Sequence, residues 1–378
     1  MGRVEFVYFD AGGGHRAAAT ALRIVTEQQL QWDVRLMNLQ ELLDSIDPVL
    51  KLSGLRLQDL YNLLLKRGWT WGSAFGLRVL QAAIRLYHPN QLQLLEDYWH
   101  KSQPALVVSL VPHFNRAIFE SLRRMTPVTP FVTVLTDLAD YPPHFWLERQ
   151  EQFVICGSEQ AVAQARSLGL RGDQIYKTSG MILHPKFYQT IAMDRAADRE
   201  RLGLDPDLPT GLVMFGGHGS SVMVEIARRL EAAKLSLQLI FICGHNERLA
   251  AELRGMQGKV HKLVEGFTTD VPYYMHVADF FIGKPGPGSI SEALAMKLPV
   301  IVERNARTMP QERYNADWVL AKQVGLVVRS FRHIARTVEE LLDPGNFARY
   351  RRNAAAVNNR AVFEIPEMLR EIMGKSTP

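Results

Sequence analysis

The chain has 378 residues, of which 47% are hydrophobic and 22% are charged, a composition typical of globular proteins. This length exceeds what one hydrophobic core usually supports, so we expect two domains. The net charge of +5 suits an anionic partner such as a nucleotide or an acidic lipid, and no nucleic-acid-binding motif accompanies it.

Cys156 and Cys243 each lie inside an apolar run, which predicts buried thiols rather than a disulfide or a zinc site. The first residues lack the apolar core of a signal peptide, and no segment reaches the roughly 20 apolar residues that cross a bilayer. We therefore expect a cytoplasmic protein, soluble or at most peripherally attached to a membrane.

The first half of the chain alternates short apolar runs with helix-forming segments. A buried strand is predicted at 4–9 and a helix at 17–30, and further strands are predicted at 34–37, 106–110, 131–135, 154–156 and 175–178. Such alternation predicts a parallel, doubly wound sheet that binds ligands at the carboxyl ends of its strands. His15, His113 and Asp137 all follow predicted strand ends.

His15 directly follows three glycines, which allow another molecule to approach the backbone closely. Because imidazole titrates near neutral pH, His15 is a candidate general base. A helix-capping or core histidine is the alternative, and the neighbouring glycines favour the catalytic interpretation. The G-x-G-x-x-G spacing of dinucleotide-binding proteins is absent from this loop.

A long, mostly helical insertion is expected from about residue 41 to residue 98. Its middle combines basic residues with tryptophans, among them Lys66, Arg67, Trp69 and Trp71. Interfacial segments that bind anionic lipid have this composition. A solvated helical hairpin would explain the pattern equally well.

The second half repeats the alternation of strands and helices. We place a domain boundary near Pro185, a linker over 186–209, a second domain over 210–345, and a helical segment over 346–378 that packs across both domains. Strands are predicted at 212–215, 237–243, 260–264, 280–282 and 299–302. The first of them ends in a Gly-rich turn that contains Gly217, His218, Gly219 and Ser220.

The strongest functional pattern runs from Asp279 to Asn315. An apolar run leads into the loop Gly283–Gly288, and Ser289 follows as the expected N-cap of a helix. A strand, a Gly-rich turn and a helix start form a phosphate-binding geometry, because free N–H groups and the helix dipole attract an anion.

Further polar residues extend this pattern toward a nucleotide sugar. Glu292 is expected in the first helical turn, where its carboxylate could reach a ribose diol, and Gln311, Glu312 and Asn315 could contact sugar hydroxyls. An ordinary βα turn with a capped helix would share the pattern of this stretch alone.

Several motifs, in this order along nearly the whole chain, resemble those of the monogalactosyldiacylglycerol synthase and processive diacylglycerol glucosyltransferase family. The first half contributes residues 12–16, 136–138, 143–146 and 180–187, and the second contributes 266–267, 284–288, 291–294, 310–312 and 315. The chain is similar, more distantly, to the N-acetylglucosamine transferase of peptidoglycan lipid intermediates.

The resemblance implies an α/β protein of the GT-B fold, with two Rossmann-like, doubly wound domains facing a central cleft. It implies an inverting glycosyltransferase that moves galactose or glucose from a UDP-sugar to diacylglycerol, with no cofactor and no catalytic metal. The expected partners are a UDP-hexose, a diacylglycerol-like acceptor and the anionic inner face of a membrane, with no nucleic acid.

The resemblance also assigns roles to residues of this chain. The backbone at Phe267 would contact uracil, Glu292 the ribose, and Gln311 with Glu312 the hexose. The diphosphate would lie at Gly217, His218, Gly219 and Ser220 and at Gly286, Pro287, Gly288 and Ser289.

On the acceptor side, the resemblance makes His15 and Asp137 catalytic. We expect them to form a base–orienter pair and favour His15 as the base. Gly13, Gly14 and His144 would lie near the acceptor, together with Lys66, Arg67, Trp69 and Trp71 at the membrane.

Other activities compete with this one. A transferase of N-acetylglucosamine to a polyprenyl-diphosphate acceptor and a UDP-sugar 2-epimerase would use the same fold, but an epimerase would not need the insertion at 41–98. A nucleotide-sugar-binding protein without activity is a further alternative, and the presence of His15, Asp137 and Glu292 argues against it.

Overall fold

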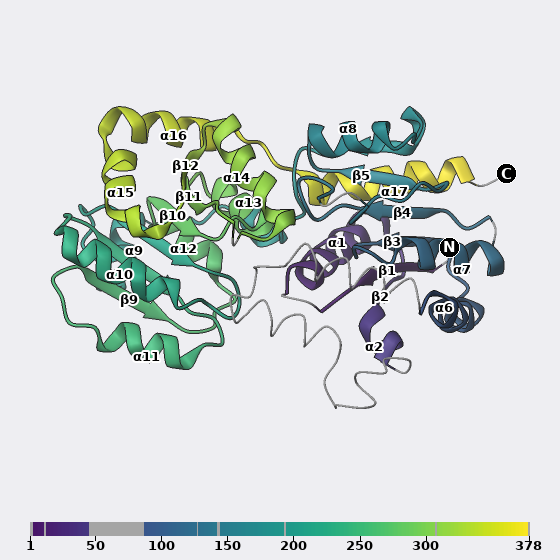
Figure 1. Cartoon of the computed structure of the whole chain (residues 1–378), viewed down its shortest axis with the longest axis horizontal. Helices are drawn as coiled ribbons and strands as arrows, with labels where there is room; N and C mark the ends of the chain where they lie inside the picture. The colour runs from purple at the N-terminus through teal and green to yellow at the C-terminus, as the bar shows by residue number, and fades with distance from the viewer. Residues whose placement is uncertain are drawn as a thin grey trace. The chain divides into compact units, whose positions relative to one another are not determined.

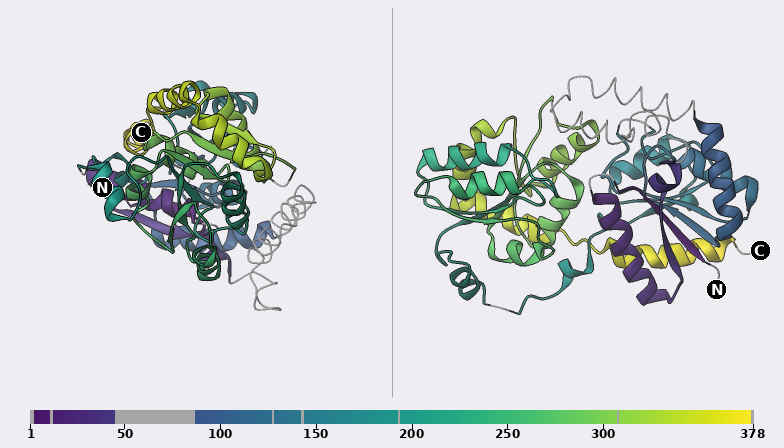
Figure 2. Two further views of the ribbon diagram at one scale, coloured as in Figure 1. Left: turned by 90° about the vertical axis from the view of Figure 1, so that its left-hand side faces the viewer. Right: turned by 90° about the horizontal axis from the view of Figure 1, so that it is seen from below.

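The computed structural model describes residues 3–10, 13–44, 87–126, 128–141, 144–192, 194–306 and 308–376. The chain divides into two compact units (Figure 1). The first comprises Met1–Pro185, Met309–Gln311 and Arg360–Pro378, and the second Lys186–Thr308 and Glu312–Asn359. Both termini therefore belong to the first unit (Figure 2).

The first unit contains a six-stranded parallel sheet in the order β2-β1-β3-β4-β5-β6. Its strands are β1 (Val4–Tyr8), β2 (Val34–Asn38), β3 (Leu106–Ser109), β4 (Phe131–Val134), β5 (Phe153–Cys156) and β6 (Ile175–Lys177). The order reverses between β1 and β3, and ligands of such sheets bind at the carboxyl strand ends beside such a reversal.

Helices cover both faces of this sheet because its strands are apolar on both sides. On one face, Phe6 packs with Leu22 of α1 (Gly14–Leu30) and Leu369 of α17 (Ala361–Ser376). On the other, Val7 packs with Trp99 of α6 (His88–Ser102) and with α7 (Asn115–Met125). The other described helices of this unit are α2 (Leu39–Leu43), α8 (Glu159–Ser167) and the short turn η2 (Gly172–Gln174). The short turn η3 (Pro185–Tyr188) begins at Pro185 and continues into the second unit.

The second unit contains a second six-stranded parallel sheet, in the order β12-β11-β10-β7-β8-β9. Its strands are β7 (Thr210–Met214), β8 (Gln238–Ile242), β9 (His261–Glu265), β10 (Phe280–Gly283), β11 (Val300–Glu303) and β12 (Gly325–Val328). β12 is the strand that the sequence pattern did not predict.

Helices again alternate with these strands. They are α9 (Arg195–Arg201), α10 (Val222–Ala233), α11 (Glu247–Gly255), α12 (Val271–Val277), α13 (Pro287–Ala295), α14 (Pro310–Lys322), η4 (Phe331–His333), α15 (Ile334–Leu342) and α16 (Pro344–Ala356). The core joins α10, α11 and α15 to the sheet through residues such as Leu230, Leu253 and Val338. The alternating, doubly wound organisation of both sheets is confirmed.

Two helices begin earlier than the sequence predicted. α1 begins at Gly14 rather than Ala17, because Gly13 takes the left-handed φ of 81° that glycine adopts readily, so His15 lies in the first helical turn. α13 begins at Pro287, whose ring fixes a helical φ, with Gly286 as the N-cap. Ser289 is therefore inside this helix rather than its cap, and Glu292 lies in the second turn rather than the first.

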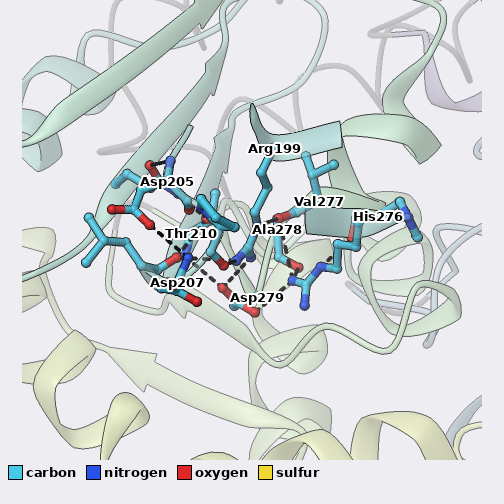
Figure 3. A network of polar contacts seen from close by, with 12 residues as sticks. Arg199, Asp205, Asp207, Thr210, His276, Val277, Ala278 and Asp279 are labelled. Carbon is cyan, nitrogen blue, oxygen red and sulfur yellow. Dashed lines mark hydrogen bonds and ion pairs between the residues drawn. The ribbon is translucent and has the colours of Figure 1, made fainter. Parts of the chain in front are cut away.

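The segment expected as a linker at 186–209 belongs to the second unit, where Asp279 holds it (Figure 3). Asp279 accepts hydrogen bonds from Arg195 at 2.7 Å, from Arg199 at 2.6 Å and from the backbone N–H of Thr210 at 2.8 Å. Because Asp279 directly precedes β10, this partly buried network connects α9 to the amino edge of the sheet.

The C-terminal segment predicted at 346–378 is divided. α16 packs with α13 and α15 in the second unit, whereas α17 packs with α1 in the first. Most of the insertion predicted at 41–98 lies outside the described residues, including Lys66, Arg67, Trp69 and Trp71. In the ranges that are described, no helix is long and apolar enough to cross a membrane.

Candidate functional site

At the carboxyl edge of the first sheet, His15 is joined to Thr136. Its Nδ1 lies 3.0 Å from the hydroxyl group of Thr136, which is the second residue after the end of β4. Desolvation lowers the pKa of His15 to about 4, and a hydrogen bond with the backbone of Leu110 opposes this effect. His15 is therefore a neutral imidazole at physiological pH.

Asp137 is buried beside this pair and has a different partner. Its Oδ2 accepts a hydrogen bond from the indole N–H of Trp146 at 2.9 Å, and the Trp146 ring lies 5.7 Å from the ring of His15. The imidazole contacts Thr136, one residue before Asp137, and the expected base–orienter pairing of His15 with Asp137 stays a prediction. The sequence analysis gave Thr136 no role, although Thr136 lies at the same strand end as Asp137.

The loop after Asp137 is organised by Asp140, which the sequence analysis also missed. Asp140 is buried and accepts hydrogen bonds from the backbone N–H groups of His144 at 3.1 Å and of Trp146 at 2.6 Å. Burial raises the pKa of its carboxyl group above the ordinary value, against the effect of these bonds. The loop orients Trp146 inward and leaves His144, an expected acceptor residue, exposed with a φ of 62°.

His113 lies at the same edge, after β3. Its backbone takes a left-handed φ of 68°, its N–H donates to the carbonyl of Phe145 at 2.8 Å, and its ring packs edge-on against Phe145 at 4.3 Å. Desolvation lowers the pKa of His113 to about 4. A Cβ added to Gly13 or Gly14 would meet open space, so a ligand has room to approach both glycines. This edge therefore carries neutral imidazoles and aromatic rings.

The carboxyl edge of the second sheet has a different chemistry, beginning with two tight loops after β7 and β8. The N–H of His245 donates to the carbonyl of Gly217 at 2.9 Å, and the amide of Asn246 donates to the carbonyl of His218 at 3.2 Å. Gly219 has a φ of 58°, and a Cβ there would lie 2.6 Å from Leu249. Only glycine fits this position, so the backbone of the loop is held in one conformation.

Lys284 is the first residue of the loop after β10, and its side chain reaches toward the Gly-rich loop after β7. Its Cε is 3.9 Å from a Cβ built on Gly216 and 3.5 Å from one built on Gly286, and its Nζ pairs with Glu312 at 2.9 Å. The amide of Asn315 donates to the carbonyl of Pro285 at 2.8 Å. These contacts attach the loop to α14 and place an ammonium group beside both Gly-rich loops.

Three side chains of the predicted donor site have definite surroundings. Glu292 of α13 is partly accessible, and desolvation raises the pKa of its carboxyl group to about 7. Glu312, predicted to contact the hexose, is buried and paired with Lys284. The amide of Gln311 contacts the sulfur of Met309 at 3.6 Å.

Phe267 follows β9 and is 58% exposed, which is unusual for a phenylalanine. Its ring stacks on the ring of His245, with the centroids 4.1 Å apart and an interplanar angle of 15°. The ring centroid of His218 lies 6.2 Å from that of His245. The sequence analysis missed His245, although its position after a predicted strand is the same signal that identified His218.

A basic hollow of about 430 Å³ lies at the carboxyl ends of β11 and β12, lined by Arg304, Asn305, Ala306, Arg313 and Arg329. Arg304 pairs with Asp317 at 3.0 Å, and Arg313 donates to the carbonyls of Ala306 and Thr308. The sequence analysis did not predict this hollow. Among the described residues there is no cluster of three or more His, Cys, Asp or Glu side chains suited to a metal ion.

Comparison with known proteins identifies the class. Residues 212–366 match the model of the glycosyltransferase family 28 C-terminal domain. This stretch of the chain is therefore similar to the C-terminal domain of these glycosyltransferases, and the resemblance to glycosyltransferases that the sequence predicted is confirmed.

The chain is also similar to individual proteins, one in sequence and two in fold. The chain is 29% identical, over 90% of its length, to the chloroplastic monogalactosyldiacylglycerol synthase of Spinacia oleracea, and it spans 66% of that relative. Its fold is similar to MurG of Acinetobacter baumannii, with a TM-score of 0.62, 11% identity and coverage of 98% and 100% of the two chains. Its fold is also similar to the UDP-GlcNAc 2-epimerase of Neisseria meningitidis bound to UDP-GlcNAc, with a TM-score of 0.64, 14% identity and coverage of 99% and 100%.

Proposed function

We propose that this protein transfers a hexose from a UDP-hexose to diacylglycerol and inverts the anomeric centre. The observation that carries the proposal is the edge formed by the adjacent strands β7 and β10. Two Gly-rich loops, the N-terminus of α13 and the ammonium group of Lys284 meet there, a combination suited to a nucleoside diphosphate.

The donor half of the reaction follows from this edge. As the bond between the anomeric carbon and the diphosphate breaks, negative charge develops on the leaving UDP. Backbone N–H groups at the start of α13 and the charge of Lys284 would stabilise it, and this requires no catalytic metal. Glu292 would accept hydrogen bonds from the ribose, Gln311 and Glu312 would contact the hexose, and the segment around Phe267 would hold the uracil.

The acceptor half requires a base. His15 is neutral at physiological pH, because desolvation lowers its pKa to about 4, and a neutral imidazole can accept the proton of a hydroxyl group. The aromatic surroundings of Phe145 and Trp146 suit an acceptor with an apolar body. Asp137 would support the site through Trp146.

Diacylglycerol is the acceptor that the synthase relative supports, because its printed name is monogalactosyldiacylglycerol synthase. A lipid acceptor requires contact with a membrane, so we propose peripheral attachment to an anionic inner leaflet through the basic, Trp-containing insertion. Replacement of Lys66, Arg67, Trp69 and Trp71 by alanine should abolish sedimentation with anionic vesicles and leave UDP affinity unchanged. Equal sedimentation of variant and wild type would refute this attachment.

The proposal is tested by identifying the product. The protein is incubated with UDP-galactose or UDP-glucose and diacylglycerol in mixed micelles, and the lipid fraction is analysed by mass spectrometry and proton NMR. A β-linked hexosyl diacylglycerol is expected, because the donor is α-linked and the reaction inverts. A product only with polyprenyl-diphosphate acceptors, or epimerisation of UDP-GlcNAc without any lipid, would replace the proposal by one of those activities.

A further inference from the structure

His15 has one ring nitrogen engaged with a hydroxyl group, and this contact constrains its chemistry. Nδ1 lies 3.0 Å from the Thr136 Oγ1. The ring also makes a hydrogen bond with the backbone of Leu110, whose carbonyl can accept only from a ring N–H. A neutral imidazole has one N–H and one lone pair. Nε2 can accept a proton only when Nδ1 carries the hydrogen, and the Thr136 hydroxyl must then be the acceptor of the Nδ1–H.

We propose that Thr136 is a positioning residue that holds His15 in the Nδ1–H tautomer and thereby makes Nε2 the catalytic base. This inference rests on the proposed transferase function. In the step it supports, the O–H bond of the acceptor breaks and its proton moves to Nε2. The hydroxyl oxygen bonds to the anomeric carbon, whose bond to the diphosphate breaks, and the electron pair of that bond leaves with UDP.

A hydroxyl in this place has a different effect from a carboxylate. A carboxylate hydrogen-bonded to Nδ1–H stabilises the imidazolium strongly, whereas a neutral hydroxyl orients the ring and adds little charge stabilisation. This agrees with the pKa of His15, which desolvation lowers to about 4. Burial therefore keeps the base neutral at physiological pH, and the uncharged Thr136 hydroxyl does not oppose this effect as a carboxylate would.

Other charged groups around His15 do not take over this role. Asp10 and Arg16, on the two sides of the glycine loop, pair with each other at 2.9 Å. Asp137 is hydrogen-bonded to Trp146, and the pKa of His113 is itself lowered by desolvation. Thr136 is therefore the polar side chain with a direct hydrogen bond to the imidazole within the described part of this edge.

The tautomer is measured directly, without any activity, by NMR of the protein labelled with nitrogen-15 in histidine. We expect the nitrogen shifts of His15 to report protonated Nδ1 and unprotonated Nε2 at pH 7.5, assigned with His15→Gln. The Nε2–H tautomer in the wild type would overturn the proposal, whether or not the protein transfers hexose to lipid.

Three variants connect the tautomer to catalysis. Thr136→Val removes the hydroxyl at nearly constant volume, and we expect kcat to fall roughly 10–100-fold with little change in the donor KM, while Thr136→Ser restores most of the activity. Thr136→Asp should move the acidic limb of the kcat/KM profile to a pH about 1–3 higher, because a carboxylate stabilises the imidazolium. An unmoved limb would contradict the positioning role.

Thr133→Val is the matched control. Thr133 is a buried threonine of β4, three residues before Thr136, and its hydroxyl donates to Gln152 at 2.9 Å, away from His15. Its replacement should lower stability about as much as Thr136→Val, without altering the pH profile. Equal losses of kcat in the two variants would mean that Thr136 acts only through folding.

Discussion

The carboxyl edges of the two sheets have the same architecture and opposite chemistry. In the first unit, the edge carries imidazoles with lowered pKa and the rings of Phe145 and Trp146. In the second, it carries Gly-rich loops, a helix N-terminus, Lys284 and an arginine-lined hollow. The first suits proton transfer from an apolar acceptor, and the second suits binding of an anion.

This difference shows that the shared fold positions the loops at the carboxyl ends of the strands, whereas the residues in those loops determine the chemistry of each site. Both sheets are parallel and flanked by helices, so both offer loops at their carboxyl edges. If the first edge serves proton transfer and the second serves donor binding, variants of the first edge should lower turnover with little effect on UDP affinity. Variants of the second edge should change the donor parameters.

The largest effect is expected for His15→Ala. Loss of a general base should lower kcat about 10²–10⁴-fold, and the donor KM should stay within about twofold because the imidazole belongs to the acceptor edge. Steady-state kinetics with varied UDP-hexose measure both parameters. His100→Ala, an exposed histidine at the end of α6, is the control and should behave as wild type. A raised donor KM with an unchanged kcat would contradict the assignment of His15 to the acceptor edge.

Lys284→Met should come next, with a loss of about 10²–10³ in kcat/KM for the donor, because it removes positive charge beside both Gly-rich loops. Glu312→Gln keeps the ammonium group of Lys284 and should lower kcat/KM for the donor much less. Lys297→Met, at an exposed position just beyond α13, controls for net charge. If Lys284→Met and Lys297→Met have equal kinetics, the ammonium group has no role in donor binding.

Glu292→Ala should raise the donor KM about 10–100-fold, because it removes the hydrogen bonds between the ribose and a charged group. The pKa of this carboxyl is raised to about 7, so it is largely protonated below that pH, and ribose hydroxyls that donate to the carboxylate should lower the pKa. UDP binding should therefore release protons near pH 6–7.

Calorimetry in buffers of different ionisation enthalpy measures this release. Glu292→Gln has no titrating group at the position and should abolish it. Proton uptake on binding, or a release that Glu292→Gln leaves intact, would contradict the contact with ribose.

Phe267→Ala should have the smallest effect, about a two- to fivefold increase in donor KM. The expected contact with uracil is made by the backbone, which alanine keeps, so the loss reflects the stacking of the ring on His245. Phe267→Tyr keeps the stack and serves as the control. An increase well above tenfold would assign the uracil contact to the ring instead.

The fold was predictable because its signals are local. Apolar runs followed by glycines, such as 280–288, identify buried strands and their carboxyl ends within a few residues. The helix starts were less accurate, because serine at 289 and glycine at 286 are both acceptable caps and the choice depends on the turn before Pro287.

The side-chain partners were not predictable, because they join residues far apart in the chain. Thr136 lies 121 residues from His15, and Glu312 lies 28 residues from Lys284. A sequence pattern placed His15 and Asp137 at the ends of two strands of one sheet, but it could not decide which of two adjacent side chains points toward the imidazole. The arginine-lined hollow draws its residues from the ends of two strands and a helix, for the same reason.

The most direct measurement is UDP release from UDP-galactose and from UDP-glucose, each with and without diacylglycerol in mixed micelles. The proposed function predicts release from one of the two donors that depends on diacylglycerol and that His15→Ala lowers at least about 100-fold. Release that is absent from both donors, or that is independent of the lipid, would contradict the assignment of a lipid glycosyltransferase.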